Sequence, residues 1–232
     1  MSRTTSGTPG QFTETDRSHV SGATHLLNME LQPGLFLFQG FAPPDQQRAL
    51  WLACRALADG PVPMYHPTVR GGRTMSVGML CLGRHWNGLT YAYEDRRTDF
   101  DGQPAPPIPP AFRELAVSVA ARAGFAIDPD ICIVNFYDGN ARLGVHQDKD
   151  ESPASLAAGI PIVSVSLGDA ARFVVGGLTR REPTHPVILR SGDVLVMGGP
   201  SRLRFHGVTR ILPGTAPAGT GPGRFNLTFR TF

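Results

Sequence analysis

The sequence lacks several features that would assign it to particular classes of protein. Among 22 basic residues only Lys149 is a lysine, and the three cysteines, Cys54, Cys81 and Cys132, show no CxxC spacing. Their odd number and their spacing argue against a disulfide framework or a cysteine-type metal site, so we expect reduced, buried thiols. No run is apolar enough for a membrane-spanning helix, and residues 1–20 lack the apolar core of a secretory signal. We therefore expect no membrane association and a cytoplasmic location.

The overall composition is that of a globular protein. Of 232 residues, 41% are hydrophobic and 18% are charged, which disfavours both disorder and coiled coil and predicts one domain. The net charge is +3, and it is carried by arginine, whose forked guanidinium suits phosphate and carboxylate alike. Genomic base composition explains such a bias equally well, so the charge permits a nucleic-acid partner without demonstrating one. We expect a monomer.

The chain divides by composition into a tail and a folded part. Residues 1–25 are rich in Ser, Thr and Gly and have few apolar side chains, so we expect a flexible N-terminal tail. We interpret residues 26–232 as a single domain. Within it, residues 26–130 supply helices and a covering segment, and residues 131–232 supply the core.

The first half of this domain contains two helical patterns. Proline-led segments with apolar residues at helical spacing predict one helix over residues 45–57 and a second over Pro110–Arg122. Between them, Thr74–Leu82 is typical of a strand. The long polar segment Arg84–Pro109 is of the kind that covers a site or crosses a surface.

The second half consists of short apolar runs separated by Gly, Asp and Pro. Such runs at this spacing predict an antiparallel sandwich or barrel, so we expect a mainly β fold, a jelly roll, with the two helices flanking it. The runs are ICIVNFY, IPIVSVSLG, ARFVVGG, PVILR, DVLVMGG, LRFHGV and RFNLTFRTF.

Three residues form a candidate metal site. On an extended chain His146 and Asp148 point to the same side, about 6 to 7 Å apart. An HxD pair arises easily by chance, and His206 alone is equally consistent with a hydrogen-bonded core histidine. Together, two imidazoles and one carboxylate on a β scaffold are typical of a non-haem Fe(II) site, with zinc as the chemical competitor.

The last strand predicts a second set of polar ligands. Alternation over Arg224–Arg230 places Arg224, Asn226, Thr228 and Arg230 on one face and phenylalanine and leucine on the other. A half-solvated strand would show the same pattern. Next to a metal site, the two arginines instead suit a small dicarboxylate, and the pair Asn135 and Tyr137 shares a face by the same rule.

The motifs HQDKDE, SRLRFHG and RFNLTFR together resemble the AlkB family of Fe(II)- and 2-oxoglutarate-dependent nucleic-acid dealkylases, over residues 35–232. The resemblance implies a double-stranded β-helix, which agrees with the jelly roll, with Fe(II) as cofactor and 2-oxoglutarate and O2 as cosubstrates. It also implies residue roles. The iron ligands would be His146, Asp148 and His206, and the residues that hold 2-oxoglutarate would be Asn135, Tyr137, Arg224, Asn226 and Arg230.

The resemblance further implies how a base is recognised. Asp150 would face the alkylated base, Trp86 would stack on it with Tyr91 nearby, and Arg70–Arg73 would belong to a nucleotide-recognition lid. The spacing between Trp86 and Tyr91 is shorter than the bacterial pattern. From charge alone, Arg180 is a further candidate for contact with phosphate or lesion, although turn arginines are commonly just solvated.

The implied activity is oxidative demethylation of 1-methyladenine and 3-methylcytosine in single- or double-stranded DNA, with RNA as a second substrate. The products would be formaldehyde, succinate and CO2, and the role would be direct-reversal DNA repair. One rival is a related enzyme acting on tRNA or another alkylated molecule. Another is a non-catalytic jelly-roll binding module in which the three metal ligands hold a structural ion such as zinc.

Overall fold

Two antiparallel β-sheets packed face to face form the centre of the protein. The computed structural model describes residues 28–232, so the tail expected over residues 1–25 lies outside the described residues. Every strand pairing within the described part is antiparallel. The seven-stranded sheet has the order β1 (Asn28–Gln32), β2 (Leu35–Phe38), β13 (Val194–Met197), β10 (Ile162–Gly168), β15 (Arg224–Arg230), β8 (Ile131–Tyr137), β5 (Gly78–Leu82). The four-stranded sheet has the order β12 (His185–Leu189), β11 (Ala170–Val175), β14 (His206–Leu212), β9 (Leu143–His146). The expected jelly roll is confirmed.

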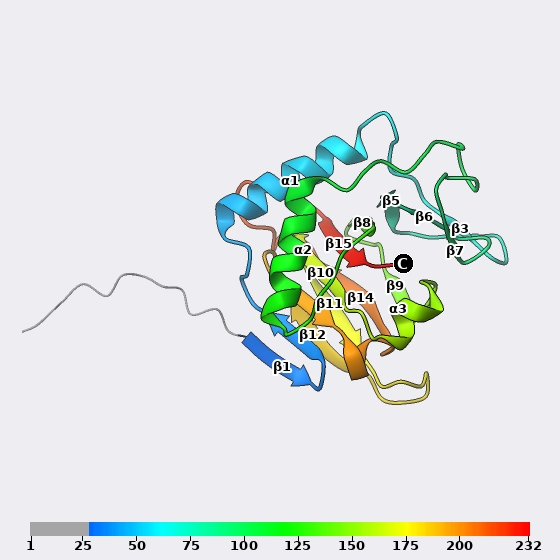
Figure 1. The fold of residues 1–232 in the computed structure, drawn as a ribbon. Coiled ribbons are helices and arrows are strands. Elements are labelled where there is room, and N and C mark those ends of the chain that lie inside the picture. Colours follow the sequence, from blue (N-terminus) through cyan, green and yellow to red (C-terminus); the bar gives the residue numbers. More distant parts are fainter. Residues whose placement is uncertain (1–27) are drawn as a thin grey trace, which may run out of the picture.

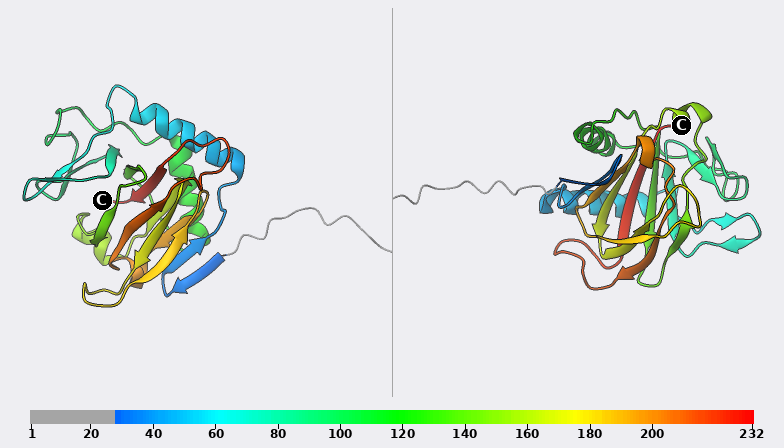
Figure 2. Two further views of the ribbon diagram at one scale, coloured as in Figure 1. Left: turned by 180° about the vertical axis from the view of Figure 1, so that it is seen from behind. Right: turned by 90° about the horizontal axis from the view of Figure 1, so that it is seen from below.

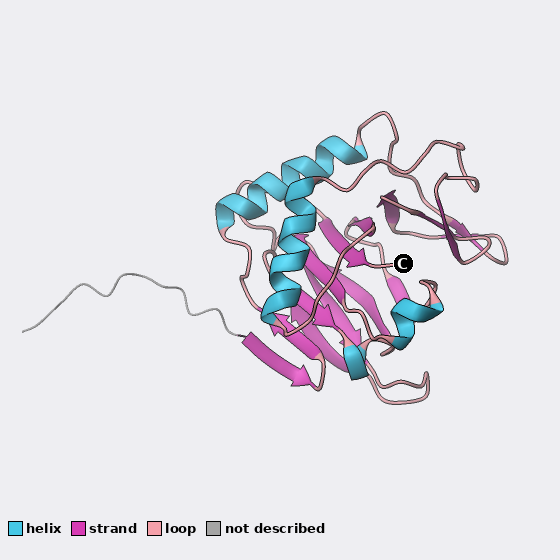
Figure 3. Cartoon of the chain, in the orientation of Figure 1, coloured by secondary structure: helices cyan, strands magenta, loops and turns pink. Residues whose placement is uncertain are grey.

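Two helices cover the outer face of the seven-stranded sheet (Figure 1). Helix α1 (Pro44–Ala58) and helix α2 (Pro110–Arg122) each begin with proline, which suits a first helical turn because its missing N–H has no partner there anyway. Their apolar stripes, including Trp51 and Phe112, pack on the sheet. Figure 3 shows these two helices on one side of the strands, while the short α3 (Pro153–Ala157) and the 3-10 turn η1 (Gly199–Ser201) lie elsewhere. No described helix has the length and apolarity to cross a membrane.

The two faces of the seven-stranded sheet have different roles, and β15 shows this most clearly. Phe225, Leu227 and Phe229 point to the helices and join the outer core. The four polar residues of the same strand point between the sheets, and all seven residues are buried. The alternation expected from the sequence is therefore confirmed, and the alternative of a half-solvated strand is wrong.

Two of the predicted strands have other bounds in the structure, and β9, which carries His146, was not among the predicted runs. The strand expected over Thr74–Leu82 is divided into β4 (Arg73–Thr74), which pairs with β3 (Thr68–Val69), and β5, which pairs with β8. The chain changes partner between them, so it cannot continue as one strand. The strand predicted from the run LRFHGV starts later than expected. β14 begins only at His206, after the turn that follows η1.

The polar segment Arg84–Pro109 contains a small hairpin formed by β6 (His85–Asn87) and β7 (Ala92–Glu94). Figure 1 and both views in Figure 2 place this hairpin and the β3–β4 hairpin at the β5 side of the molecule, away from β1. We call residues 65–76 and 84–104 the lid, because both hairpins lie in these two segments, beside β5 at the edge of the seven-stranded sheet.

Truncation of a side chain on the apolar face of β15 should destabilise the whole fold. We expect Leu227→Ala to lower the free energy of unfolding by about 2 to 5 kcal/mol, because Leu227 is fully buried between the sheet and the helices. Urea denaturation followed by circular dichroism measures this loss. The control Val117→Ala, at a position 41% exposed on α2, should change stability by less than about 0.5 kcal/mol. Equal losses in both variants would contradict the assignment of the core.

Candidate metal centre

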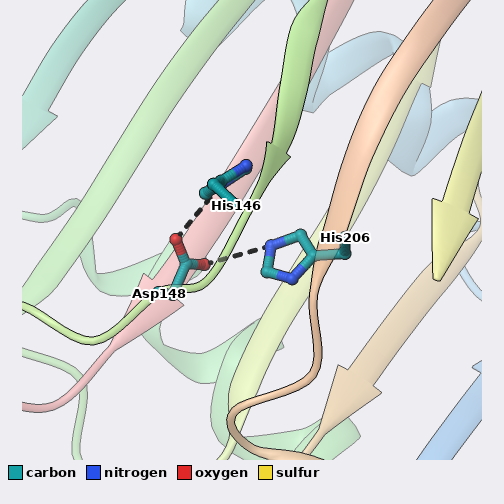
Figure 4. A group of neighbouring side chains, drawn as sticks. All are labelled: His146, Asp148 and His206. Carbon is teal, nitrogen blue, oxygen red and sulfur yellow. Dashed lines mark ion pairs between the residues drawn. The ribbon is translucent and has the colours of Figure 1, made fainter. Parts of the chain in front are cut away.

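The three predicted metal ligands meet at one end of the four-stranded sheet (Figure 4). His146 ends β9 and His206 begins β14, and the two residues are paired across the strands. Asp148 follows two residues beyond β9, and its carboxylate lies 3.4 Å from Nε2 of His146 and 3.5 Å from Nε2 of His206. One ligand atom from each residue lies within 4.8 Å of the others. The structure therefore brings together the residues that the sequence singled out.

Both imidazole rings are held by backbone carbonyls. Nδ1 of His146 donates to the carbonyl oxygen of Gly144 at 2.8 Å, and Nδ1 of His206 donates to that of Arg204 at 2.9 Å. A neutral ring whose Nδ1–H is bonded in this way presents a lone pair on Nε2, whereas a protonated ring donates from Nε2 to Asp148. Both Nε2 atoms face Asp148, so the donor set fits a divalent metal with two imidazoles and one carboxylate.

The Asp148 carboxylate is buried, yet it is held in the charged form. Burial alone would raise the pKa of Asp148, but the positive charge of Arg230 and the hydrogen bonds from His146 and His206 hold it well below its usual range. Arg230 Nη2 lies 2.7 Å from the carboxylate. Burial would lower the pKa of His146, and hydrogen bonding to Asp148 together with its charge raises it overall. The pocket thus holds a permanent anion that a cation can use.

The predicted 2-oxoglutarate residues come from two neighbouring strands, β8 and β15. The Asn226 amide donates to the Ser164 hydroxyl at 2.8 Å and accepts from the Thr228 hydroxyl at 3.0 Å. Oδ1 of Asn135, which lies opposite Asn226 in the sheet, is buried without a partner. 2-Oxoglutarate offers only acceptor oxygens, so it would bind the NH2 group of Asn135 and not this oxygen.

Arg224 and Tyr137 are the most buried of the cosubstrate candidates. Its Nη2 donates to the Ser166 hydroxyl at 2.7 Å, while its Nε has no partner, and burial lowers the pKa of its guanidinium to about 10. Tyr137 lies opposite Arg224, and burial raises the pKa of its hydroxyl above the usual value. A buried arginine with an unused donor fits the distal carboxylate of a small diacid.

A cavity between the sheets joins these groups. It is lined by the three metal ligands together with Asn135, Tyr137, Asn226 and Arg230, whereas Arg224 lies outside its lining. Sequence reasoning missed the side chains that complete its walls, which belong to strands expected only to fill the core. They include Leu143, Ile162, Ser164, Phe173, Leu195, Met197 and Val208, whereas Thr228 also lines the cavity and lies on the polar face that the sequence predicted.

The lid reaches the metal site through Trp86. Its indole Nε1 donates to Oδ2 of Asp150 at 2.8 Å, which brings two of the predicted substrate residues into direct contact. Tyr91 stands edge-on to Trp86 with 5.6 Å between ring centroids, at a backbone φ of 57°, and Arg70 lies over its ring at 5.2 Å. Arg180 is separate from this group, because it is exposed and lies over the Phe205 ring at 5.2 Å.

Three residues without a role in the sequence prediction complete the site: Tyr93, Glu151 and Arg202. The Tyr93 hydroxyl of β7 accepts a hydrogen bond from Arg230, so the lid also contacts the cosubstrate strand. Glu151 is fully buried and lies 3.0 Å from Arg202 and 3.5 Å from Arg230. The sequence could have drawn attention to Glu151 because it belongs to the motif HQDKDE. Its spacing in the sequence did not indicate that its partners would be Arg202 and Arg230.

Comparison with known proteins agrees with this geometry. Residues 34–230 match the family model of the 2OG-Fe(II) oxygenase superfamily. An AlkB homologue from Caulobacter vibrioides, named as an alpha-ketoglutarate-dependent dioxygenase, is 41% identical over 85% of this chain and 87% of its own length. The chain belongs to the AlkB family of 2OG-Fe(II) oxygenases. Fe(II) is therefore its cofactor type, and 2-oxoglutarate and O2 are the cosubstrates of the family.

Relatives within the AlkB family carry different names. The Arabidopsis thaliana protein named DNA N(6)-methyladenine demethylase ALKBH1D is 42% identical over 87% of this chain and 50% of its own length, so the chain spans about half of that relative. Escherichia coli AlkB is 43% identical over 69% of this chain and 73% of its own length. The solved structure of OsALKBH1 superposes with a TM-score of 0.83 at 40% identity, covering 88% of this chain and 100% of that one.

Removal of one imidazole should abolish metal-dependent stabilisation. Fe(II) added under anaerobic conditions at about 100 times its Kd should stabilise the protein by about 2.7 kcal/mol, because the ion binds only the folded site. We expect this gain to disappear in His206→Ala and to remain in His185→Ala, whose histidine is exposed on β12. Thermal denaturation with and without the metal measures both. An undiminished gain in His206→Ala would place the metal elsewhere.

Proposed function

We propose that this protein is an oxidative demethylase of alkylated bases in DNA, with RNA as a second substrate, acting in direct-reversal repair. The observation that carries the proposal is the contact between Trp86 and Asp150 beside the metal ligands. An aromatic face and a carboxylate next to an oxidising metal form a site for a cationic methylated base. The names of the AlkB and ALKBH1 relatives support a nucleic-acid substrate.

Two sets of residues in this chain would bind the metal and the cosubstrate. His146, Asp148 and His206 would hold the iron, and Arg224, Asn226, Arg230, Asn135 and Tyr137 would hold 2-oxoglutarate. When bound, iron and 2-oxoglutarate supply the oxidising chemistry, in which O2 converts 2-oxoglutarate to succinate and CO2 and one oxygen atom hydroxylates the methyl group. The hydroxymethyl group on the base nitrogen then leaves as formaldehyde.

Asp150 and Trp86 would select the base. 1-Methyladenine and 3-methylcytosine carry a positive charge at neutral pH, so a carboxylate and an indole face favour them over neutral bases. The methyl group lies on the Watson–Crick edge, so the base must be flipped out of a duplex or come from a single strand. A damaged base that pairs poorly requires the least free energy to flip out of the duplex.

A second candidate substrate is N6-methyladenine in DNA, which the names of the Arabidopsis relatives specify. This base is neutral, so it would gain less from the Asp150 carboxylate. The non-catalytic binding module is a weaker alternative, because a structural ion gives no reason to bury an arginine with an unused donor such as Arg224.

The organisation of the chain belongs to the same proposal. Residues 26–232 would act as one dioxygenase domain. The expected division needs a correction, because residues 26–130 supply β1, β2 and β5 of the seven-stranded sheet as well as the helices and the lid, and residues 131–232 supply the other strands of the jelly roll. We propose that it works as a monomer in the cytoplasm.

The deciding experiment uses mass spectrometry of single-stranded oligonucleotides that carry one 1-methyladenine or one N6-methyladenine. Each is incubated with the protein, Fe(II), 2-oxoglutarate, ascorbate and air, beside a His146→Ala control. We expect the wild type to remove the methyl group from 1-methyladenine, and we expect His146→Ala to leave it in place.

The other outcomes separate the alternatives. Faster loss of methyl from N6-methyladenine would favour the second substrate. Succinate formation with both oligonucleotides unchanged would keep the oxygenase chemistry and refute both substrates. A protein that binds metal but forms no succinate would favour the non-catalytic module.

The charge of Asp150 should determine the preference for a cationic base. We expect Asp150→Asn to lower kcat/KM for 1-methyladenine about tenfold, which corresponds to about 1.4 kcal/mol of lost charge attraction. The asparagine oxygen can still accept from the Trp86 indole, so the ring should stay in place. Activity on N6-methyladenine should change less than about twofold.

The matched control is Asp45→Asn, which removes the same charge from an exposed position on α1. It should leave both activities unchanged. Equal losses on the cationic and the neutral base in Asp150→Asn would contradict an electrostatic role for this carboxylate.

A further inference from the structure

The β6–β7 hairpin of the lid has two faces with different partners. Trp86 on β6 lies opposite Tyr93 on β7. On this face of the hairpin Trp86 contacts Asp150 and Tyr93 contacts Arg230, both beside the metal ligands. His85, the neighbour of Trp86, must point to the other face, because successive residues of a strand alternate. That second face lies away from the metal ligands and has no part in the proposed reaction.

A single buried carboxylate organises the second face. Asp99 accepts from Nε2 of His85 at 2.6 Å, from the Tyr65 hydroxyl at 3.2 Å, and from the backbone N–H of Gly88 at 3.3 Å. The His85 side chain is 0% exposed and that of Asp99 is 2% exposed. These three donors belong to the segment before β5, to β6 itself and to the turn that follows β6, so one side chain links all three.

The protonation of this cluster follows from its partners. Nδ1 of His85 is buried without a partner, so the ring proton belongs on Nε2, where it is donated to Asp99. Burial and the negative charge of Asp99 raise the pKa of Tyr65, so its hydroxyl remains a donor. Although a paired aspartate and histidine resemble a catalytic dyad, their burial on the far face of the hairpin excludes contact with a substrate.

An arginine closes the cluster from the side. Arg97 is fully buried, forms two hydrogen bonds to Asp101, and lies 5.0 Å from the ring centroids of Tyr65 and Phe100. Those two rings stack with centroids 4.6 Å apart. The far face of the hairpin therefore packs against a cluster of polar and aromatic side chains.

The hairpin needs such support. Strands β6 and β7 are three residues long each and pair only with one another among the described strands. An isolated two-stranded hairpin of this size is marginally stable in water. Its position over Asp150 must therefore come from contacts outside its own ladder. Asp99 provides one buried set of them, and Thr98 provides another through Asn87 and Glu94.

We propose that Asp99 is a positioning residue for base recognition, which holds β6 through His85 and the Gly88 turn so that Trp86 stays over Asp150. The kinetic part of this inference rests on the proposed function, whereas its structural part concerns the lid alone. Loss of the Asp99 charge would leave two buried donors poorly satisfied and loosen the hairpin, although Asp99 itself bonds to none of the residues that would hold iron or 2-oxoglutarate.

The test compares Asp99→Asn with Asp95→Asn, which changes a carboxylate 92% exposed in the same segment. Amide hydrogen exchange followed by mass spectrometry reports on the lid directly. We expect exchange over residues 85–94 to accelerate about tenfold or more in Asp99→Asn, with β8, β10 and β15 unchanged, because the hairpin opens locally. Asp95→Asn should match the wild type.

A fluorescence measurement gives an independent readout. The chain has two tryptophans, and Trp51 lies on the buried face of α1, so a Trp51→Phe background leaves Trp86 as the reporter. We expect iodide to quench Trp86 more strongly in Asp99→Asn than in Asp95→Asn. Tyr65→Phe, which removes one donor and leaves the carboxylate in place, should show a smaller change and serves if Asp99→Asn does not fold.

Kinetics connect the lid to substrate. We expect Asp99→Asn to raise KM for the 1-methyladenine oligonucleotide about fivefold to tenfold, while succinate formation in the absence of oligonucleotide stays within about twofold of the wild type. In a Trp86→Phe background the same substitution should have a smaller effect on KM, because Asp99 acts through that indole.

Two results would overturn the proposal: unchanged lid exchange in Asp99→Asn, or accelerated exchange that extends across the sheets, which would make Asp99 a general stability residue. If the wild type demethylates no oligonucleotide, the proposed function fails, and hydrogen exchange and quenching still decide whether Asp99 holds Trp86.

Discussion

A carboxylate removed from water must be paired, and Asp148 is buried between two sheets that carry its partners on different strands. Arg230 of β15 approaches it from the seven-stranded sheet, and imidazoles from β9 and β14 approach it from the four-stranded sheet. If either sheet shifted, a buried charge would lose its compensation, which is far more costly than the pair itself is stabilising. The same arginine contacts Glu151 and Tyr93. The floor of the site and the lid are thus tied to one charged group.

The parts of the structure that could be predicted from the sequence are those encoded by local periodicity. In β15 the two-residue period separates the apolar from the polar face, and burial of both faces follows once helices cover one of them. The spacing of His146 and Asp148 is equally local. Chemistry alone left iron and zinc open, and the resemblance to a known family selected iron.

The parts that were missed depend on partners distant in the chain. The break between β4 and β5 exists because the chain leaves β3 for β8, which no pattern within Thr74–Leu82 records. Asp99 lies 34 residues from Tyr65, and each side chain by itself is typical of a polar surface segment. Glu151 likewise acquires its meaning only from Arg202 and Arg230. Burial of a charged residue is set by the fold as a whole, so sequence spacing could not reveal it.

The division between a rigid floor and an attached lid explains how related proteins can carry names for different bases while sharing one reaction. The cosubstrate candidates lie on β8 and β15 inside the seven-stranded sheet, and the metal ligands lie at the ends of β9 and β14 and just beyond β9, where a change of substrate gives no reason for them to move. The groups that would meet a base stand on a three-residue strand whose position depends on a few buried polar contacts. Fold and oxidising chemistry are therefore shared across the family, whereas under the proposed function the choice of lesion would depend on what fixes Trp86 relative to Asp150. Differences in substrate among relatives should accordingly reside in the far face of the lid as well as in the residues that touch the base.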